Sequence, residues 1–518
     1  MRKLKEFLKN GKFTWQLLYI GVILGCLGFH TFLIADIFKA SPSDGFSREL
    51  KIGEVNYGNS KYNRNHMVTA LSPDQKTIGI FAVDGTASKI FRVDAAGKIL
   101  LEKPVALDLS EMAKISVFFI DDTHLRVLYG TDTLNSTIID METGAASKSE
   151  PLTIMEEFDH DGSTVMVTHD DGLYGMDLSI SNPKEVLIMQ GSIDSFRVTV
   201  NDDLLYVTVV NEIDLSFTSG QSLILNKDFE IVTQYEVFPR TDNRLIGRIK
   251  DVYFNDGILT SLFVWSDTKG NKNLITALQS DIDTGAQLTK FSQFFALSFD
   301  KMSIDRAEKG QVSLIMQDNL MGGQNIVYNT LKDGASTITV PLSKIRGVSA
   351  LPSYFEADGK RILIFSDLNK KARDIYIASS DSELIKNTTS YNTINFALVF
   401  GTCVFISIVA VFAALIMILV FEPLPGIVLL LLYKLTDQYK HKFKVQIWVP
   451  AAFHTIVKIY ASLKLAETTR AISEVDLSIL GSKPFIYALL ILSSVFALFC
   501  THRCAKQRND YDSVINYT

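Results

Sequence analysis

The hydrophobic pattern divides the chain of 518 residues into three parts. Long apolar runs occupy the first 40 residues and the last 130, whereas the middle alternates short apolar runs with polar turns. Short apolar runs bounded by Asp and Gly are typical of strands, and runs of about 20 apolar residues are long enough for helices that cross a bilayer. The pattern therefore predicts an all-β domain between helical membrane segments.

The N-terminal apolar run, residues 13–38, is the first predicted transmembrane helix. At about 1.5 Å per residue it can cross a hydrocarbon core of roughly 30 Å. It is longer than the apolar core of a cleavable signal peptide and lacks a convincing cleavage site, so we expect an uncleaved anchor. Residues 23–26 also resemble a lipoprotein cleavage box, but the apolar sequence continues beyond Cys26.

The C-terminal region, residues 394–501, is predicted to be a helical membrane domain, which brings the expected number of transmembrane helices to about four. Its clearest spans are residues 395–421 and 484–500. The run 445–463 either spans the membrane or lies at its interface as an amphipathic helix. Residues 424–433, beside a proline-rich helix breaker, are too short to cross alone and are either re-entrant or interfacial.

Basic residues cluster on one side of these spans. They occupy the N-terminal tail 1–12, the loop 434–444 and the C-terminal tail 502–518. Because cytoplasmic loops carry an excess of Lys and Arg, four spans place all three clusters in the cytoplasm and send residues 45–390 across the membrane. The chain is therefore predicted to be a multi-pass protein of the cell membrane with a large extracytoplasmic domain.

Net charge and cysteine content indicate which partners and which cellular location to expect. The net charge is −6, so nothing suggests a nucleic-acid partner. The outer segment contains no cysteine, because all four lie in or beside the apolar runs, at Cys26, Cys403, Cys500 and Cys504. A secreted animal domain of this size commonly carries disulfides, so their absence suggests a bacterial cell surface.

A turn phrase recurs seven times in the middle segment. It sets a polar residue, often followed by Gly, before an apolar run, at Asp74, Asp122, Asp161, Asp203, Asp256, Lys309 and Asp358. The copies are 39 to 53 residues apart, within or slightly beyond the spacing of propeller blades. A second strand with its own turn usually follows, most clearly at 138–145 and 278–286. This order predicts seven four-stranded antiparallel blades.

A ring of seven blades must close on itself. The last copy lacks an outer strand, and residues 48–56, which precede the first copy, could supply it. Such closure would remove a bare sheet edge and bring both ends of the ring together. It would also turn Leu50, Ile52 and Val55 toward neighbouring sheets.

Residues 71–83 and 355–367 resemble the repeat of TolB-type and WD40-like β-propellers, which runs serine, proline, aspartate, glycine, lysine and then an apolar stretch. Residues 72–74 and Lys76 match it, with Gln75 in place of glycine, and residues 358–360 match it in the last copy. The resemblance covers roughly residues 46–380. It implies the propeller architecture and carries over no catalytic residue.

Few catalytic or metal-binding motifs can be recognised in the outer segment. Residues 159–163 and 281–285 resemble the start of calcium loops, but neither supplies ligands over the roughly 12 residues that such a loop needs, so we interpret both as blade turns. The histidines lack metal-ligand spacing and lie at His66, His124, His160 and His169. We therefore expect no enzyme, cofactor or metal site, although dispersed Ser, His and Asp residues could meet in space.

Three aromatic residues are candidates for a glycan or peptide surface, namely Tyr174, Trp265 and Tyr354. Most aromatic side chains in propellers pack between blades, which is the competing interpretation for each of them.

The first span carries a glycine pattern. Gly21, Gly25 and Gly28 lie near one face of the helix at a spacing that permits close approach of another helix. Glycine is also tolerated in an apolar helix without any packing role, and the sequence leaves both interpretations open.

The third span carries ionisable residues. His454 and Lys458 are four residues apart, on one helical face, and the nearest acidic candidate is Glu422 at the cytoplasmic end of the second span. Ionisable groups at membrane depth are costly and usually face protein or water, so these residues are candidates for an intramembrane interaction. Alternatively, Lys458 extends to the membrane surface from an interfacial helix.

Two functional classes follow from this organisation. The first is a binding, scaffolding or sensory subunit, in which the propeller and the membrane domain contact a protein partner such as a transporter or an envelope assembly machine. The alternative is an enzyme or transport component that uses His454 and Lys458 or a site at the centre of the propeller. The gene neighbourhood would discriminate between them.

The topology is directly testable. We expect a reporter fused at residue 270 to be located outside the cytoplasm and a reporter fused at residue 518 to be located in the cytoplasm. The reason is that the three basic clusters lie on one side of the membrane. A cytoplasmic signal at residue 270 would contradict the proposed topology.

Overall fold

The computed structural model describes two separate units of the chain, Ser41–Thr389 and the flanking Met1–Ala40 with Ser390–Thr518. In the first unit it describes residues 41–389 apart from 57–66, 85–86, 108, 110–113, 181–182, 215–216, 243–244, 268–272, 296–301, 321–322, 333–334, 345–348 and 369–371. In the second unit it describes only residues 24, 25, 28, 401, 404, 405 and 408.

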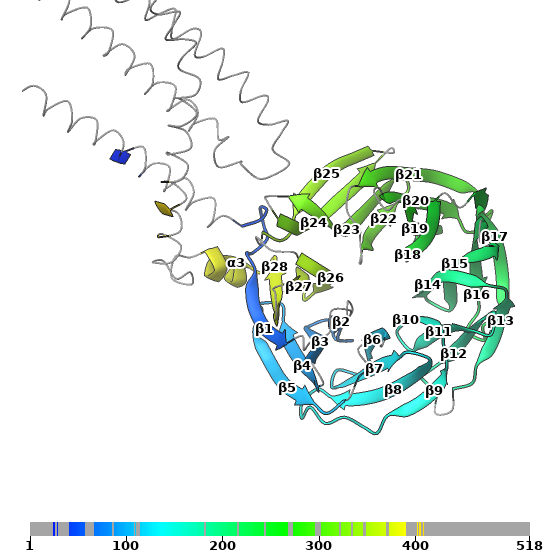
Figure 1. The fold of residues 1–518 in the computed structure, drawn as a ribbon, viewed down its shortest axis with the longest axis horizontal. Coiled ribbons are helices and arrows are strands. Elements are labelled where there is room, and N and C mark those ends of the chain that lie inside the picture. Colours follow the sequence, from blue (N-terminus) through cyan, green and yellow to red (C-terminus); the bar gives the residue numbers. More distant parts are fainter. Residues whose placement is uncertain are drawn as a thin grey trace, which may run out of the picture. The chain divides into compact units, whose positions relative to one another are not determined.

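Residues 41–389 form seven four-stranded sheets arranged in a ring (Figure 1). Blade one holds β2 (Met67–Leu71), β3 (Thr77–Asp84), β4 (Ala87–Asp94) and β5 (Ile99–Val105). Blade two holds β6 (Lys114–Phe119), β7 (His124–Gly130), β8 (Thr133–Asp140) and β9 (Glu150–Ile154). Blade three holds β10 (Glu157–Asp161), β11 (Thr164–His169), β12 (Gly172–Asp177) and β13 (Val186–Gln190). Blade four holds β14 (Ile193–Asn201), β15 (Leu204–Asp214), β16 (Phe217–Leu225) and β17 (Ile231–Asp242).

Blade five holds β18 (Leu245–Asn255), β19 (Ile258–Asp267), β20 (Asn273–Asp281) and β21 (Gln287–Phe295). Blade six holds β22 (Ser303–Glu308), β23 (Gln311–Leu320), β24 (Gly323–Lys332) and β25 (Ala335–Pro341). Blade seven holds β26 (Ser349–Ala357), β27 (Lys360–Leu368), β28 (Ala372–Ser379) and β1 (Leu50–Asn56), and a short helix α3 (Ser382–Thr389) follows it. The predicted seven-bladed all-β propeller is confirmed.

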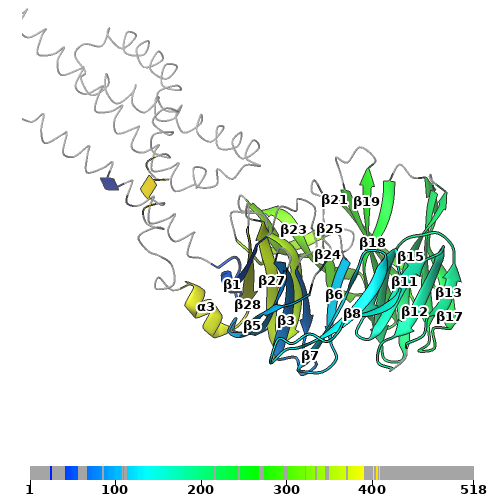
Figure 2. The ribbon, with the colours of Figure 1, turned by 60° about the horizontal axis from the view of Figure 1, so that its bottom comes forward.

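The strands are not of equal length around the ring. Strands of blade five such as β18, with 11 residues, exceed strands of blade two such as β7, with 7. Figure 2 shows the blade-five strands rising above the rest of the ring, and α3 beside β1 and β28 at its outer edge. The two faces of the propeller therefore differ in relief.

The N-terminal strand β1 closes the ring, as the sequence predicts. It pairs antiparallel with β28, with Leu50 opposite Ile377 and Val55 opposite Arg373. The register shifts around Ile52, which is an extra residue in the ladder. Because this bulge interrupts the alternation of side chains, Ile52 and Val55 are both buried although they lie three positions apart.

Closure seals a hydrophobic interface between blades seven and one. Ile52 and Val55 of β1 pack in one cluster with blade-one residues such as Phe91 and blade-seven residues such as Ile375. Gly53 lies against the ring of Phe91, and a Cβ at this position would lie 2.7 Å from two of its carbon atoms. Glycine at residue 53 therefore permits the close contact of the closing strand with blade one.

The residues that mark the seven copies of the turn phrase do not all occupy the same position in their turns. Asp256 and Asp358 occupy the first position of two-residue turns and have φ of 48° and 51°, each followed by a glycine with positive φ, as type I′ turns require. Asp161, in contrast, ends β10 and pairs with Thr164, so its turn begins at Gly162. The strand register, and not the Asp-Gly pair, decides which residue turns.

The position where the propeller repeat carries glycine has a left-handed backbone here. Gln75 has φ of 55°. The turn is held by Ser72, whose backbone N–H donates to the Thr77 carbonyl at 2.9 Å and whose Oγ accepts the Thr77 N–H at 3.0 Å. Glycine adopts this conformation without strain, whereas Gln75 adopts it against the usual preference of a residue with a side chain.

Replacement of Gly53 by Val tests the closing contact. We expect the free energy of unfolding to fall by about 1–3 kcal/mol, because the new side chain must displace the buried ring of Phe91. Thermal unfolding of the purified protein measures it. The matched control is Glu54→Val in the same strand, where the loss should be no more than about 1 kcal/mol because Glu54 makes only a surface ion pair with Lys51. Equal losses in the two variants would contradict this account of closure.

Candidate functional site

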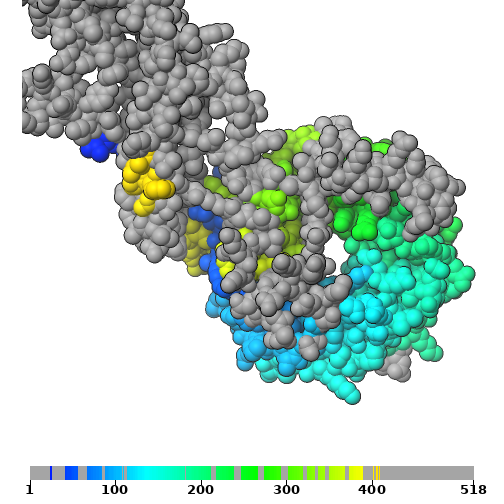
Figure 3. Space-filling view, in the orientation of Figure 1, coloured from blue at the N-terminus to red at the C-terminus, as the bar shows by residue number. Residues whose placement is uncertain are grey.

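The innermost strands of the seven blades, β2, β6, β10, β14, β18, β22 and β26, surround the centre of the ring (Figure 1). Each pairs with only one neighbouring strand within its sheet, so its other edge presents backbone N–H and C=O groups without a ladder partner. Such groups need acceptors and donors from elsewhere. Figure 3 shows an opening within the ring.

Carboxylates of one blade accept N–H groups from the inner strand of the next. Asp159 of β10 accepts the N–H of Val198 at 2.9 Å, and Asp161 accepts the N–H of Val200 at 2.7 Å. Asp251 of β18 accepts the N–H of Ile304 in β22 at 2.7 Å. These bonds tie blade three to blade four and blade five to blade six, and they satisfy edges that the sheets leave unpaired.

Blades four and five are joined by two further groups. The Oγ of Ser195 accepts the N–H of Ile249 at 3.2 Å. The Nε of Arg197 donates to the carbonyl of Lys250 at 3.1 Å. A continuous series of hydrogen bonds thus follows the inner strands from blade three to blade six.

Two acids of this series, Asp159 and Asp251, have raised pKa values. Burial raises the pKa of Asp159, and the positive charge of Arg197 opposes that rise. Burial also raises the pKa of Asp251, to about 7, although two backbone N–H groups favour its charged form. The negative charge of Asp159 adds to the rise at Asp251. The centre of the propeller therefore holds a carboxyl group that titrates near neutral pH.

A serine and a histidine meet at the boundary of blades two and three. The Oγ of Ser116 in β6 lies 2.6 Å from the Nε2 of His160 in β10. The Nδ1 of His160 lies 3.3 Å from the carbonyl oxygen of Gly162. Both side chains are partly exposed. The pairing of these two residues could not be predicted from the sequence, because they lie 44 positions apart in different blades.

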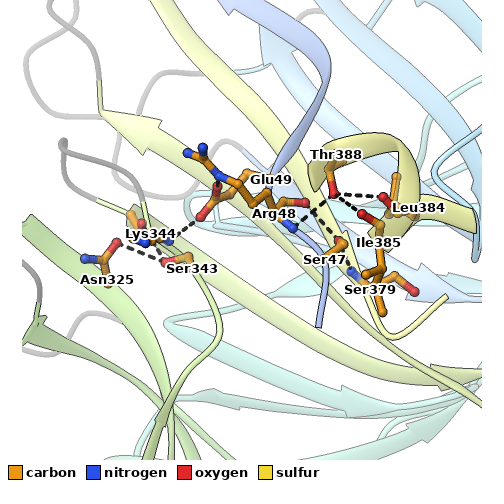
Figure 4. Close-up of polar contacts among 11 residues, drawn as sticks. Ser47, Arg48, Glu49, Asn325, Ser343, Lys344, Ser379, Leu384, Ile385 and Thr388 are labelled. Atoms are coloured by element: carbon orange, nitrogen blue, oxygen red, sulfur yellow. Dashed lines mark hydrogen bonds and ion pairs between the residues drawn. The ribbon is translucent and has the colours of Figure 1, made fainter. Parts of the chain in front are cut away.

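The two ends of the ring are fastened to each other, as Figure 4 shows. The N–H of Ser47 donates to the carbonyl of Ser379 at 2.8 Å, and the N–H of Ser379 donates to Ser47 Oγ at 2.9 Å. The N–H of Arg48 donates to Thr388 Oγ1 in α3 at 3.2 Å. We call these hydrogen bonds, together with the contact between Glu49 and Lys344, the clasp.

The clasp also reaches blade six. The carboxylate of Glu49, whose side chain is only 3% exposed, accepts the N–H of Lys344, just beyond β25. Helix α3 is held in turn by Asp381, which accepts the N–H groups of Glu383 and Leu384 at 2.9 Å each and pairs with Lys360 at 2.6 Å. The predicted proximity of the two ring ends is confirmed.

The predicted membrane residues lie mostly outside the described part of the chain. This holds for Gly21, Glu422, His454 and Lys458 and for the four predicted spans except single positions. Gly25 and Gly28 are helical, and a Cβ at either would meet no atom within 4 Å. No helix in the described residues has the length and apolar character that a membrane span requires. The interaction and packing roles of these residues stay predictions.

The predicted turns and aromatics can be placed in the outer domain. Asp281 accepts backbone N–H groups of Asp283 and Thr284, as a turn does, and the described residues contain no group of three or more His, Cys, Asp or Glu that could hold a metal ion. Trp265, which looked exposed in the sequence, is buried and packs on Phe238. It is unavailable to a glycan or peptide ligand.

Tyr174 and Tyr354 are partly exposed, but both contact neighbouring rings. Tyr174 stacks on His169 with centroids 4.0 Å apart, and Tyr354 lies beside Tyr328 at 6.3 Å. Packing against other side chains thus accounts for the positions of all three aromatic candidates.

No family model and no curated protein matches the chain. Solved structures with a similar fold include the Dos1 propeller, with a TM-score of 0.38, 9% identity and coverage of 64% of this chain and 94% of that one. BamB from Moraxella catarrhalis has a TM-score of 0.33, 11% identity and coverage of 63% and 99%. The polysaccharide lyase Uly1 has a TM-score of 0.40, 12% identity and coverage of 63% and 92%. At these values the likeness carries no functional argument, and the class of seven-bladed β-propeller rests on the sheets themselves.

The titration of Asp251 gives a prediction with a defined sign. An unfolded chain ionises Asp near about 3.9, whereas folded Asp251 keeps its proton to about pH 7. The folded state therefore holds an extra proton between these values, and this group makes stability fall as pH rises from about 4 to about 7. Asp251→Asn cannot ionise, so the difference in melting temperature, variant minus wild type, should rise across this range. The control Asp203→Asn, in an exposed turn, should show no such trend, and a flat difference for Asp251→Asn would contradict the assignment.

Proposed function

We propose that the chain is a membrane-anchored binding, scaffolding or sensory subunit whose propeller contacts a protein partner in a membrane complex, such as a transporter or an envelope assembly machine. The observation that carries the proposal is the clasp. The chain enters and leaves the ring at blade seven. The predicted span 13–38 ends a few residues before the ring, and the predicted span 395–421 begins a few residues after it. A ring held at one blade between two anchors leaves its remaining blades available to a partner.

The outermost strands offer apolar contact area. Exposed apolar side chains recur on the outer strands of five blades, at Ile99, Leu100, Ile154, Val186, Leu187, Ile231, Val232 and Ile338. Single exposed apolar residues are normal on any protein, but adjacent pairs on β5, β13 and β17 provide side chains suited to a protein interface. This supports a protein partner more than a glycan.

The location proposed for this partner is the outer side of the membrane. The argument rests on the basic clusters at 1–12, 434–444 and 502–518 and on the cysteine-free outer segment. Within the membrane, His454, Lys458 and Glu422 are the proposed contact residues, with Lys458 paired to an acidic residue of the partner or extended to the surface.

The alternative function, an enzyme or a transport component, has one observation in its favour. Ser116 and His160 form a close pair at the centre of the propeller, where the sequence analysis placed its alternative site. This pair does not depend on the membrane topology.

Site-specific crosslinking in intact membranes tests the partner. We place a photoreactive amino acid at Leu187 or Val232, whose exposed fractions are 46% and 59%, and at Asp203 as an exposed polar control. We expect a discrete protein adduct from at least one outer-strand position and none from Asp203. Identical adducts at all three positions, or no protein adduct at either outer-strand position, would contradict the proposal.

The same experiment in a Lys458→Leu background addresses the intramembrane site. If Lys458 contacts the partner, this variant keeps normal surface amounts and loses the adduct or the co-purified partner. An unchanged adduct would reduce Lys458 to a side chain that extends to the membrane surface.

A further inference from the structure

The Ser116 and His160 pair has a defined direction of hydrogen bonding. A carbonyl oxygen only accepts, so the contact of His160 Nδ1 with the Gly162 carbonyl at 3.3 Å requires the proton on Nδ1. In the neutral ring the lone pair then lies on Nε2. The hydroxyl of Ser116, 2.6 Å away, must donate to it. The geometry thus fixes both the tautomer and the donor.

The protonation state of the histidine agrees with this direction. Burial lowers the pKa of His160 below its ordinary value of 6.5, so the ring is neutral at physiological pH. The neighbouring carboxylates of Asp159 and Asp161 oppose that shift, because they stabilise the positively charged ring. If the neutral ring takes up a proton, these neighbouring carboxyl groups therefore favour the resulting positive charge.

The neighbouring groups hold the imidazole ring of His160 in place. The ring of Phe118 packs against His160 with centroids 5.3 Å apart. Asp159 and Asp161 are themselves fixed by the N–H groups of Val198 and Val200, so strand β10 is anchored on both sides of His160. Ser116 and His160 both belong to inner strands, and both residues are partly exposed.

We propose that Ser116 is an activated nucleophile, with His160 as its general base, and that the pair forms an acyl-transfer site for small carboxylic esters at the centre of the propeller. A nucleophile in hydrogen-bond contact with a base that a third group orients is the arrangement that such chemistry requires. Here the third group is the Gly162 carbonyl. This inference is independent of the membrane-subunit function.

The reaction balances with water as the only co-reactant. Ser116 Oγ attacks the ester carbonyl carbon, and its proton passes to His160 Nε2. The tetrahedral intermediate expels the alcohol, which takes that proton, and the acyl group stays on Ser116. Water, deprotonated by His160, then attacks the acyl group, releases the carboxylic acid and restores the serine.

A fluorophosphonate probe on the full-length protein in membranes tests the nucleophile. The Oγ–P bond forms as the P–F bond breaks, and fluoride leaves together with the serine proton. We expect mass spectrometry of digested wild-type protein to locate the phosphonyl group on Ser116. The labelling rate should rise with pH and reach half its maximum below pH 6.5, because His160 must be neutral to act.

Substitutions of Ser116 and His160, compared with a control substitution, test whether labelling depends on the proposed residues. Ser116→Ala should abolish labelling, and His160→Gln should lower its rate by at least about 100-fold, as loss of a general base does. The matched control is Ser195→Ala, because Ser195 is also an inner-strand serine in an interblade hydrogen bond but has a backbone N–H as its partner. It should leave labelling at wild-type rate.

The wild-type protein alone can contradict the proposal, so the test does not depend on whether a variant folds. If Ser116 of the wild-type protein carries no label at millimolar probe, the pair is only an interblade hydrogen bond. Turnover of p-nitrophenyl acetate that survives in Ser116→Ala would overturn the assignment to this site as well.

Discussion

The pairing of β1 with β28 is the constraint on which the rest of the propeller depends. Without it blade seven would expose the edge of β28, and the hydrophobic cluster shared by blades seven and one would lose Ile52 and Val55. Closure also fixes the circumference, because every other interface joins blades that are consecutive in sequence. The inner-strand hydrogen bonds from Asp159, Asp161 and Asp251 then add polar ties between consecutive blades of the closed ring.

The fold could be predicted from sequence because its signals are local. A turn phrase repeated at blade spacing indicates the blades, and the missing outer strand of the last copy indicates what closes the ring. The register could not be predicted so well. Asp161 and Asp256 look alike in sequence, yet one ends a strand and the other turns, because hydrogen-bond pairing with the next strand decides the position. Trp265 looked exposed for a similar reason, since its contacts with Phe238 and Gly247 come from a neighbouring blade and strand.

The candidate site was beyond sequence reasoning for a different reason. Ser116 and His160 belong to different blades, and only the packing of blade two on blade three brings them together. The same holds for Asp251, whose pKa rises because of burial against the neighbouring inner strand. One signal was present in the Asp-His-Asp sequence at 159–161, where three ionisable residues interrupt an inner strand. Polar residues in such strands satisfy free edges, and that structural duty also concentrates reactive groups at the centre of the ring.

The clasp has a mechanical consequence. Leu50 at the start of β1 lies opposite Ile377 near the end of β28, so the two segments that leave the ring emerge from the same end of an antiparallel pair. A force that drew these segments apart would break the β1–β28 hydrogen bonds one after another, as a zipper opens, and not all at once in shear. The bonds from Ser47 to Ser379 and from Arg48 to Thr388 lie ahead of the first strand pair and would bear the load first. The resistance of the ring to lateral tension between its two ends is therefore set by a few serine and threonine hydrogen bonds.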